Sequence, residues 1–305
     1  MKFLLFADLH YFPEVFYKAS REDITEIQQA ALREGCDFII HAGDFCHGPT
    51  QAHTAEAVRA YNEFSIPSYH CLGNHDADRS TYEETIAAYN MPDGHYFFDC
   101  KGYRIIVLNP NFFKLGEEYI HYSQGNYFGH AAARDWVPPE QLAWLEKTIA
   151  AAPHPCILIS HESFERSDGV QNRQEVLDII NRANAKRPNS VLMCINGHHH
   201  RDHLRILDNV AYFEVNSSVF EYVPHRHPLY PDELNKAYIG MQNTLLFDKP
   251  LYCIVTVEGT TVDIKGTKAD YFMGITPEML GDYLAPNAMF LRPVTADIKD
   301  EHFTL

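Results

Sequence analysis

The sequence contains no long hydrophobic run. No window approaches the roughly 20 apolar residues that a membrane-spanning helix needs, so we expect neither a membrane segment nor a membrane partner. The apolar stretch at residues 2–7 is too short for the hydrophobic part of a signal peptide, and Asp8 ends it. We interpret this stretch as a buried first strand.

Positive charge is also scarce. The chain of 305 residues has 25 Lys and Arg against 41 Asp and Glu, which gives a formal net charge of -16. A protein that binds long nucleic acid through its phosphates is normally basic, so we expect no long nucleic acid as a partner. The fractions of hydrophobic residues (46%) and charged residues (22%) are ordinary for a soluble globular protein and argue against disorder.

Cysteines are few, and no two of them form a CxxC pair. Seven scattered cysteines favour buried thiols in a reducing cytoplasm over a disulfide framework or a zinc–thiolate site. The sequence also lacks internal repeats, linkers and low-complexity stretches. We therefore expect a single cytoplasmic domain over residues 1–305, and the sequence leaves its oligomeric state open.

Strand-like and helix-like segments alternate through the first two thirds of the chain. Helical spacing covers 20–34, where Ser20 suits the first capping position and Gly35 follows the end. The other predicted helices are 52–64, 81–89, 141–150 and 175–185, and the predicted strands are 2–7, 38–42, 68–72, 104–108, 156–160 and 191–196. The alternation predicts an α/β fold with parallel strands.

The rest of the chain is less regular. We expect strands at 209–216, 252–257 and 261–264, the last two joined as a hairpin, within a C-terminal hairpin and tail at 250–305. Two aromatic-rich segments, 109–136 and 220–247, match no element and are predicted to be loops. Their aromatic side chains either stack on a flat group of a substrate or form a separate hydrophobic cluster, and both interpretations stay open.

Polar side chains gather where the predicted strands end. The first strand ends in Asp8-Leu-His10, the second in Gly43-Asp44, the third in Gly73-Asn74-His75-Asp76, and two later strands end in His161 and in Gly197-His198-His199-His200. Residues two apart on an extended chain point the same way, so Asp8 and His10 are expected to share a face, as are His198 and His200. Because the carboxyl ends of parallel strands form one crevice, all these side chains should meet there.

In this order, the motifs resemble those of the calcineurin-like metallophosphoesterase superfamily over roughly residues 1–220. The stretch from Gln141 to Leu145 is also similar to a helix that these enzymes carry before their fourth motif. One departure is His47, because many members have Asp or Asn three residues after the aspartate of Gly-Asp. The resemblance implies a four-layer α/β/β/α sandwich of two mixed sheets flanked by helices.

The resemblance also implies two metal ions as cofactors. One ion would be bound by Asp8, His10, Asp44 and His200, and the other by Asp44, Asn74, His161 and His198, with Asp44 bridging. These donors are nitrogen and oxygen only, which favours divalent or trivalent Mn, Fe or Zn over a thiolate-bound metal. With two carboxylates as the only anionic side chains, the loaded site stays positive and attracts phosphate.

His75 is left over from both ligand sets. We expect it to act as general acid toward the leaving oxygen, or as a donor to the phosphoryl group. Asp76 either orients His75 or serves as a turn residue. Further candidates for substrate binding are Asn109, for which a plain turn at Asn109-Pro-Asn111 is favoured, and Arg166 and Arg173, which either clamp an anion or are solvated.

The predicted function is hydrolysis of a small phosphoester, with a phosphodiester or nucleotide-type substrate preferred. Alternatives are a phosphomonoesterase, a protein phosphatase or a nuclease of the same fold, because fold and metal centre do not choose a substrate. A non-catalytic, metal-binding scaffold for protein interactions is a further alternative, as is a histidine-rich metal-storage protein.

Overall fold

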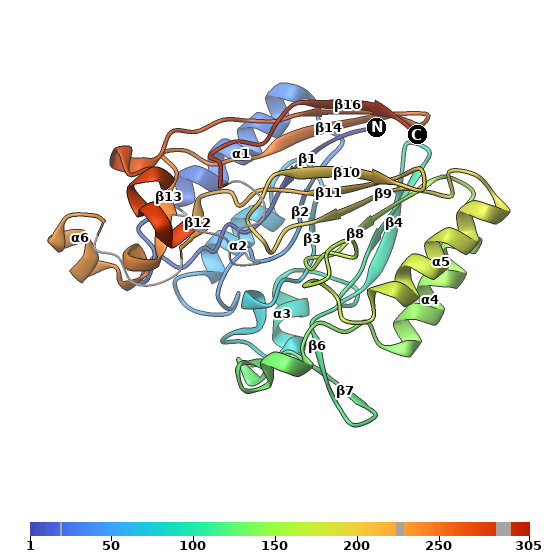
Figure 1. Ribbon diagram of the computed structural model, residues 1–305, viewed down its shortest axis with the longest axis horizontal. Helices are drawn as coiled ribbons and strands as arrows, with labels where there is room; N and C mark the ends of the chain where they lie inside the picture. The colour runs from blue at the N-terminus through green and yellow to red at the C-terminus, as the bar shows by residue number, and fades with distance from the viewer. Residues whose placement is uncertain (19, 224–228, 285–293) are drawn as a thin grey trace.

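Two mixed sheets form the centre of the molecule (Figure 1). The structure is a computed structural model that describes residues 1–18, 20–223, 229–284 and 294–305. In this described part, the first sheet has the order β16–β15–β14–β1–β2–β3, with bounds Glu301–Thr304, Thr261–Lys265, Cys253–Glu258, Lys2–Phe6, Phe38–His41 and Ser68–His70. The second sheet has the order β10–β11–β9–β8–β5–β4, with bounds His203–Leu207, Val210–Glu214, Val191–Asn196, Cys156–Ile159, Tyr103–Val107 and Tyr96–Cys100.

Each sheet has a parallel centre and antiparallel edges. The neighbours β1, β2 and β3 are parallel, as the alternating pattern predicted, and so are β5, β8, β9 and β11. Antiparallel strands β14, β15 and β16 extend the first sheet, and β4 and β10 close the second. The parallel centres bring the carboxyl ends of β1, β2, β3, β8 and β9 to one side of the molecule.

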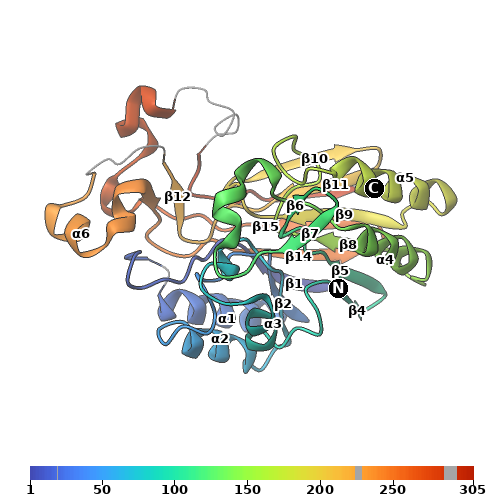
Figure 2. The same cartoon turned by 90° about the horizontal axis from the view of Figure 1, so that it is seen from below.

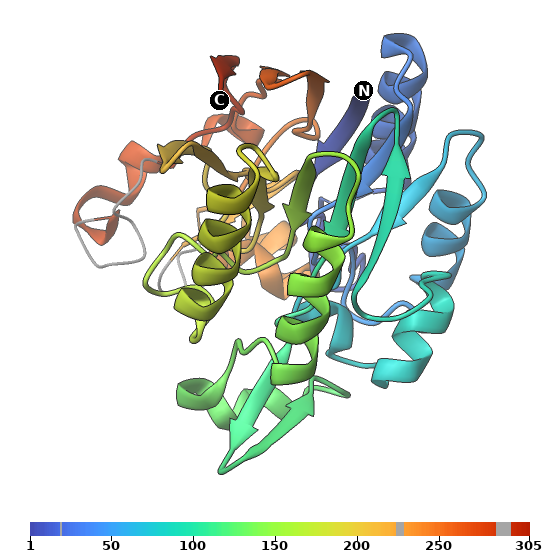
Figure 3. The same ribbon diagram turned by 90° about the vertical axis from the view of Figure 1, so that its right-hand side faces the viewer.

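Helices cover the outer faces of both sheets. Helices α1 (Arg21–Glu34) and α2 (Ala55–Asn62), with α3 (Tyr82–Ala88) beside them, lie on the first sheet (Figure 2). Helices α4 (Pro139–Ala150) and α5 (Arg173–Lys186) lie against the second (Figure 3). The four-layer α/β/β/α sandwich is therefore confirmed.

Alternation along the strands explains the layers. In β8, Ile157 and Ile159 belong to the hydrophobic cluster between the sheets, whereas Leu158 belongs to the cluster under α4 and α5. Both faces of the second sheet are thus buried, and its parallel strands are mostly apolar.

The ends of α1 follow the predicted signals. The Ser20 hydroxyl accepts a hydrogen bond from the N–H of Asp23, and the Asp23 carboxylate accepts one from the N–H of Ser20. Gly35 ends the helix in a left-handed conformation with φ of 65°. Such caps typically contribute about 1 kcal/mol each to the stability of the fold.

The two aromatic segments contain regular structure, so the prediction of plain loops is wrong. The first holds the hairpin of β6 (Phe112–Leu115) and β7 (Glu118–His121) and a 3₁₀ segment, and the second holds β12 (Phe220–Tyr222), α6 (Asp232–Ala237) and β13 (Thr244–Leu246). Strands of three or four residues are too short to leave a readable period in the sequence.

The C-terminal region is only in part as expected. Strands β14 and β15 form the predicted hairpin, but β16 pairs with β15 as an edge strand instead of belonging to a surface tail. Residues 224–228 of the second aromatic segment and 285–293 of the predicted tail lie outside the described residues. Among the described helices, none is long and apolar enough to cross a membrane.

Candidate metal centre

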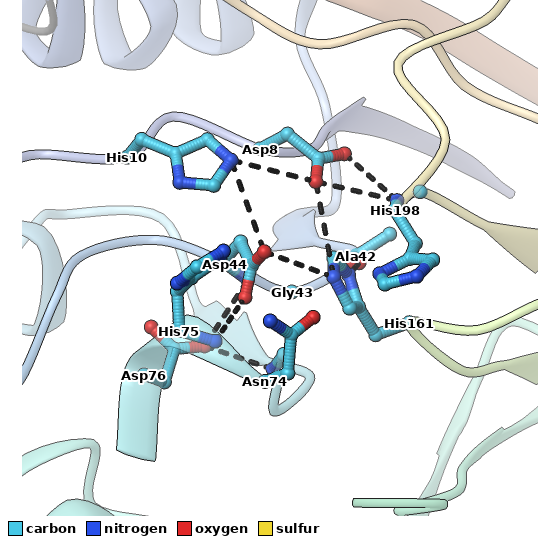
Figure 4. Close-up of polar contacts among 12 residues, drawn as sticks. Asp8, His10, Ala42, Gly43, Asp44, Asn74, His75, Asp76, His161 and His198 are labelled. Carbon is cyan, nitrogen blue, oxygen red and sulfur yellow. Dashed lines mark hydrogen bonds and ion pairs between the residues drawn. The ribbon is translucent and has the colours of Figure 1, made fainter. Parts of the chain in front are cut away.

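The seven predicted metal ligands meet at the carboxyl ends of five strands, and Figure 4 labels all of them except His200. Asp8 and His10 follow β1, Asp44 follows β2, Asn74 follows β3, His161 follows β8, and His198 and His200 follow β9. Six of the seven are at least nine-tenths buried, and Asp8, His10 and His161 are fully inaccessible. Residues from both sheets, which are distant from one another in the sequence, therefore form one buried cluster.

The backbone at these positions is strained. Five of the seven residues have positive φ, namely Asp8 (51°), His10 (48°), Asp44 (54°), His198 (71°) and His200 (53°). The predicted reason for the convergence, an extended chain with side chains two apart, is therefore wrong. A left-handed conformation costs roughly 1–2 kcal/mol per residue and persists only where the surroundings enforce it. Here the N–H groups of Asp8 and His10 donate to the carbonyls of Gly43 and Asp44, at 3.0 and 2.9 Å.

Motif glycines allow the close approach of the strand ends. A Cβ atom on Gly43, which has φ of 95°, would lie 2.2 Å from Nδ1 of His161. A Cβ atom on Gly73 would lie 2.2 Å from both the backbone nitrogen and Oδ1 of Asp44. These two positions exclude every larger side chain if the ligands are to stay in place.

The ligand atoms form two adjoining groups. In the first, Oδ1 of Asp8 lies 3.3 Å from Nε2 of His200 and 3.9 Å from Nε2 of His10. In the second, Oδ2 of Asp44 lies 3.1 Å from Nε2 of His161, and a nitrogen of His198 lies within 4.8 Å of both ligand atoms. Oδ2 of Asp44 is also 3.8 Å from Nε2 of His10, so this carboxylate lies between the groups.

Hydrogen bonds to backbone carbonyls outside the cluster orient the imidazoles of His161 and His200. The Nδ1–H of His161 donates to the carbonyl of Ala42 at 2.8 Å, and that of His200 donates to the carbonyl of Phe220 at 3.0 Å. Nε2 is then the nitrogen that faces the carboxylates. Metal-binding histidines are typically held in this way.

Asn74 provides a direct test of whether a metal fits. Its Nδ2 donates to the hydroxyl of Tyr127 at 3.3 Å, whereas its buried Oδ1 has no hydrogen-bond partner among the described residues. A buried amide oxygen without a partner costs free energy unless it coordinates an ion. Carboxylate and amide oxygens with imidazole nitrogens are suitable donors for Mn, Fe or Zn. The residues therefore fit a metal centre.

The charges in the cluster are coupled. Burial lowers the pKa of His10 and of His198 well below the ordinary value, so both are neutral and able to coordinate. Burial also lowers the pKa of His161, but the Asp44 carboxylate outweighs it and raises that pKa well above the ordinary value. A proton held between His161 and Asp44 must leave when a metal ion binds, so metal affinity should rise with pH.

His75 lies beside the cluster, and Asp78 orients it. Nδ1 of His75 is 2.8 Å from Oδ2 of Asp78, and the backbone N–H of His75 donates to Oδ1 of Asp44 at 2.8 Å. Burial lowers the pKa of His75, but Asp44 and Asp78 outweigh it and raise the pKa above the ordinary value.

The prediction that Asp76 orients His75 is wrong. The Asp76 carboxylate accepts hydrogen bonds from the N–H groups of Gly73, Asp44 and Cys46 and from the hydroxyl of Tyr89, which is the alternative role of a turn residue. The reason is the 3₁₀ turn His75–Ala77, since residues three apart lie above one another in a 3₁₀ helix. Asp78, and not Asp76, therefore faces His75.

The three predicted substrate contacts are used elsewhere. Asn109 is buried, and its Oδ1 accepts a hydrogen bond from the N–H of Asn111, as in the favoured turn. Arg166 makes a bidentate ion pair with Asp168. Arg173 donates to the carbonyl of Glu165 at 3.4 Å. Neither arginine contacts a predicted metal ligand.

Asp78, which lies near the cluster, was missed by the sequence analysis, although its position three residues after His75 was a weak signal. His47 was noted only as a departure from the family pattern, and Tyr127 and Tyr222 only as members of the two aromatic segments. The place of Tyr222 beside the cluster was not predictable, because it depends on the pairing of β12 with β13, which are more than 20 residues apart. Its ring centroid lies 5.1 Å from that of His200 and 5.5 Å from that of His10.

Comparison with known proteins agrees with this site. The family model described as calcineurin-like phosphoesterase matches residues 1–202. A dimetal phosphatase from Danio rerio has a similar structure, with a TM-score of 0.61, 13% identity, and coverage of 87% of this chain and 95% of that one. GAP50 of Plasmodium, described as the anchor in the inner membrane complex, gives a TM-score of 0.53 at 13% identity, with coverage of 90% and 86%.

No curated protein sequence matches the chain significantly. The two structures share its fold at low identity, whereas the family model covers about two thirds of the chain, including all the strand-end motifs. The chain therefore belongs to the calcineurin-like phosphoesterase family, whose members are metal-dependent hydrolases.

Proposed function

We propose that the protein is a dinuclear metal-dependent phosphohydrolase that cleaves a small phosphoester. The observation that carries the proposal is the pair of adjoining ligand groups, Asp8–His10–His200 and Asp44–His161–His198, with Asp44 between them. The ligands of each ion are those that the family pattern assigns, with Asn74 completing the second set.

The chemistry divides between the metal centre and the chain. Two bound ions would supply a hydroxide near neutral pH and positive charge beside the phosphoryl oxygens. The chain supplies the proton donor. Nδ1–H of His75 is held by Asp78, which leaves Nε2 to carry the proton toward the leaving oxygen, and the raised pKa favours the protonated form of His75.

Aromatic side chains on one wall of the site support a substrate with a flat group. Phe220 stacks on His10 with ring centroids 5.1 Å apart, and Tyr222 lies against His200. The hydroxyl of Tyr222 has no hydrogen-bond partner in the described part of the chain. Tyr222 therefore supports a nucleotide-type substrate or an aromatic phosphodiester. Phe113 and Tyr122 of the first aromatic segment belong instead to a separate hydrophobic cluster.

Hydrolysis of bis(p-nitrophenyl) phosphate beside p-nitrophenyl phosphate tests this proposal. Metal-free protein is reconstituted with Mn²⁺, and Asp44→Asn serves as the blank. We expect turnover that needs both the metal and Asp44, with a preference for the diester. Equal turnover by Asp44→Asn and the unchanged protein would contradict the proposal.

A scaffold is the second candidate, because GAP50 is described as an anchor. This chain keeps all seven ligand positions and His75, which favours catalysis. Two tightly bound ions without turnover on any phosphoester would instead favour the scaffold. The net charge of -16 supports a small substrate over long nucleic acid. A cytoplasmic location stays a prediction, consistent with seven cysteines that all lie in the described part and are unpaired.

A further inference from the structure

The second ring nitrogen of His10 leads away from the metal centre into a chain of hydrogen bonds. Nδ1 of His10 lies 3.1 Å from Nε2 of His47, and Nδ1 of His47 lies 2.8 Å from Oδ2 of Asp78. His47 is 7% exposed. This series of contacts depends on His47, the residue three positions after Asp44.

Asp78, at the end of this series of hydrogen bonds, determines which ring nitrogen of each histidine carries the hydrogen. Burial alone would raise the pKa of Asp78, but hydrogen bonds from His47 and His75 lower it to about 2. An ionised carboxylate only accepts hydrogen bonds, so the hydrogen of His47 is on Nδ1. Nε2 of neutral His47 is then an acceptor, which places the hydrogen of His10 on its Nδ1 and leaves the lone pair of its Nε2 facing Asp8 and Asp44.

The same carboxylate also holds His75. Oδ2 of Asp78 accepts from Nδ1 of both His47 and His75 at 2.8 Å, and Oδ1 accepts from the hydroxyl of Tyr127 at 2.6 Å. The rings of His47 and His75 are 4.5 Å apart. With both oxygens occupied, Asp78 has little freedom to rotate, and the two imidazoles share one anchor.

We propose that Asp78 and His47 are positioning residues that fix the proton of His10 so that its Nε2 binds a metal ion. Asp78 thereby sets two properties of the enzyme at once: metal affinity on the His10 side, through His47, and the orientation of the proton donor His75. The inference rests on the proposed function for the identity of the bound ions. It predicts that loss of His47 weakens the binding of one ion and leaves the binding of the other unchanged.

Metal binding by the full chain tests the proposal without reference to turnover. Metal-free protein is titrated with Mn²⁺, and the number of bound ions and their Kd values are measured for three variants. His47→Phe keeps a ring but makes no hydrogen bonds. His47→Asn keeps an acceptor for His10 and a donor for Asp78. His95→Phe, a partly buried histidine beside Trp144, is the matched control.

We expect His47→Phe to raise the Kd of one of the two ions about 10–100-fold and to leave the Kd of the other unchanged. This is the usual effect of removing the hydrogen-bond partner of a ligating histidine. His47→Asn should stay within a few-fold of the unchanged protein, and His95→Phe should match it. Unchanged Kd values for both ions in His47→Phe would overturn the proposal. Equal weakening of both ions with a lower Tm would also overturn it, since that result indicates a packing role.

A kinetic comparison separates the two properties. At saturating Mn²⁺, His47→Phe should recover most of its kcat, whereas Asp78→Ala should not, because His75 has lost its hydrogen-bond acceptor. A third bound ion in the unchanged protein that is lost in His47→Phe would mean that His47, His75 and Asp78 bind a metal themselves, and would refute the positioning role. The Asp44→Asn blank tests the proposed function separately, so the two failures are distinguishable.

Discussion

Two hydrogen-bonded pairs of buried histidines can be compared in this molecule. His41 and His70 lie on neighbouring strands β2 and β3, with Nε2 of His41 2.6 Å from Nδ1 of His70. His10 and His47 lie just beyond the carboxyl ends of β1 and β2, with ring nitrogens 3.1 Å apart. Both pairs are inaccessible or nearly so. Sequence and burial alone do not distinguish them.

The two pairs differ in the hydrogen-bond partners of their outer ring nitrogens. The N–H of Gly43 donates to Nδ1 of His41, so Nε2 of His41 donates to His70, and Nε2 of His70 donates in turn to Oδ1 of Asn62 at 2.6 Å. Every ring nitrogen of the core pair has a protein partner. The pair at the strand ends instead finishes in the carboxylate of Asp78, and Nε2 of His10 lies among the other predicted ligand atoms, 3.1 Å from Nε2 of His200. The comparison teaches that the terminal partners, and not the imidazoles, decide whether such a pair is structural or functional.

Replacing one histidine in each pair tests this difference most strongly. We expect His10→Phe to lower kcat/KM by a factor on the order of 10³, since a metal's share of transition-state stabilisation is several kcal/mol. We expect His70→Phe to keep the turnover of the folded protein but to reduce the free energy of unfolding by about 1–3 kcal/mol, because Asn62 loses its donor. Steady-state kinetics and urea unfolding of both variants measure this. Loss of metal binding in folded His70→Phe would erase the distinction.

Gly43 connects the core pair to the candidate metal centre, because its N–H donates to His41 and its Cα faces His161. Ala at this position has a strained backbone and a Cβ atom that clashes with His161, 2.2 Å from its Nδ1. We expect Gly43→Ala to weaken metal binding at least tenfold and to lower Tm by several degrees. Gly35→Ala is the matched control, because Gly35 has a similar positive φ but open space around its Cα. Equal metal affinity in the two variants would contradict this expectation.

The smallest expected effect is on the pH dependence of the free energy of unfolding. Burial, followed by His161, lowers the pKa of His41 from 6.5 to about 3. A histidine with a depressed pKa in the folded state contributes stability that is complete above pH 6.5 and is lost as the pH falls toward 3. At pH 4.5 the loss is on the order of 2 kcal/mol.

His41→Gln keeps an acceptor for Gly43 and a donor for His70 but does not titrate. We therefore expect its free energy of unfolding to fall less than that of the unchanged protein between pH 7 and pH 4.5. Urea unfolding at the two pH values measures this difference. Identical pH dependence would show that His41 does not contribute.

The sequence was informative where the chemistry is local. Strand-end motifs such as Gly73-Asn74-His75 predicted which side chains come together, because parallel neighbouring strands end on one side of a sheet. The partner of His75 was not accessible in this way, because the choice between Asp76 and Asp78 depends on a 3₁₀ turn that has no sequence period. Tyr222 depends on a short strand pair, and the burial of Asn109 depends on Gln141 of α4, which accepts its N–H.

The left-handed conformations of five predicted metal ligands imply a trade-off between stability and activity. Glycine adopts positive φ without penalty, so substituting glycine for Asp8 or His198 should relieve strain even as it removes a ligand. Metal-free variants of this kind can equal or exceed the unchanged protein in stability, as is common when an active site is dismantled. A search for stabilising substitutions alone would therefore tend to erase this site, and any engineering of the protein needs selection for metal binding as well.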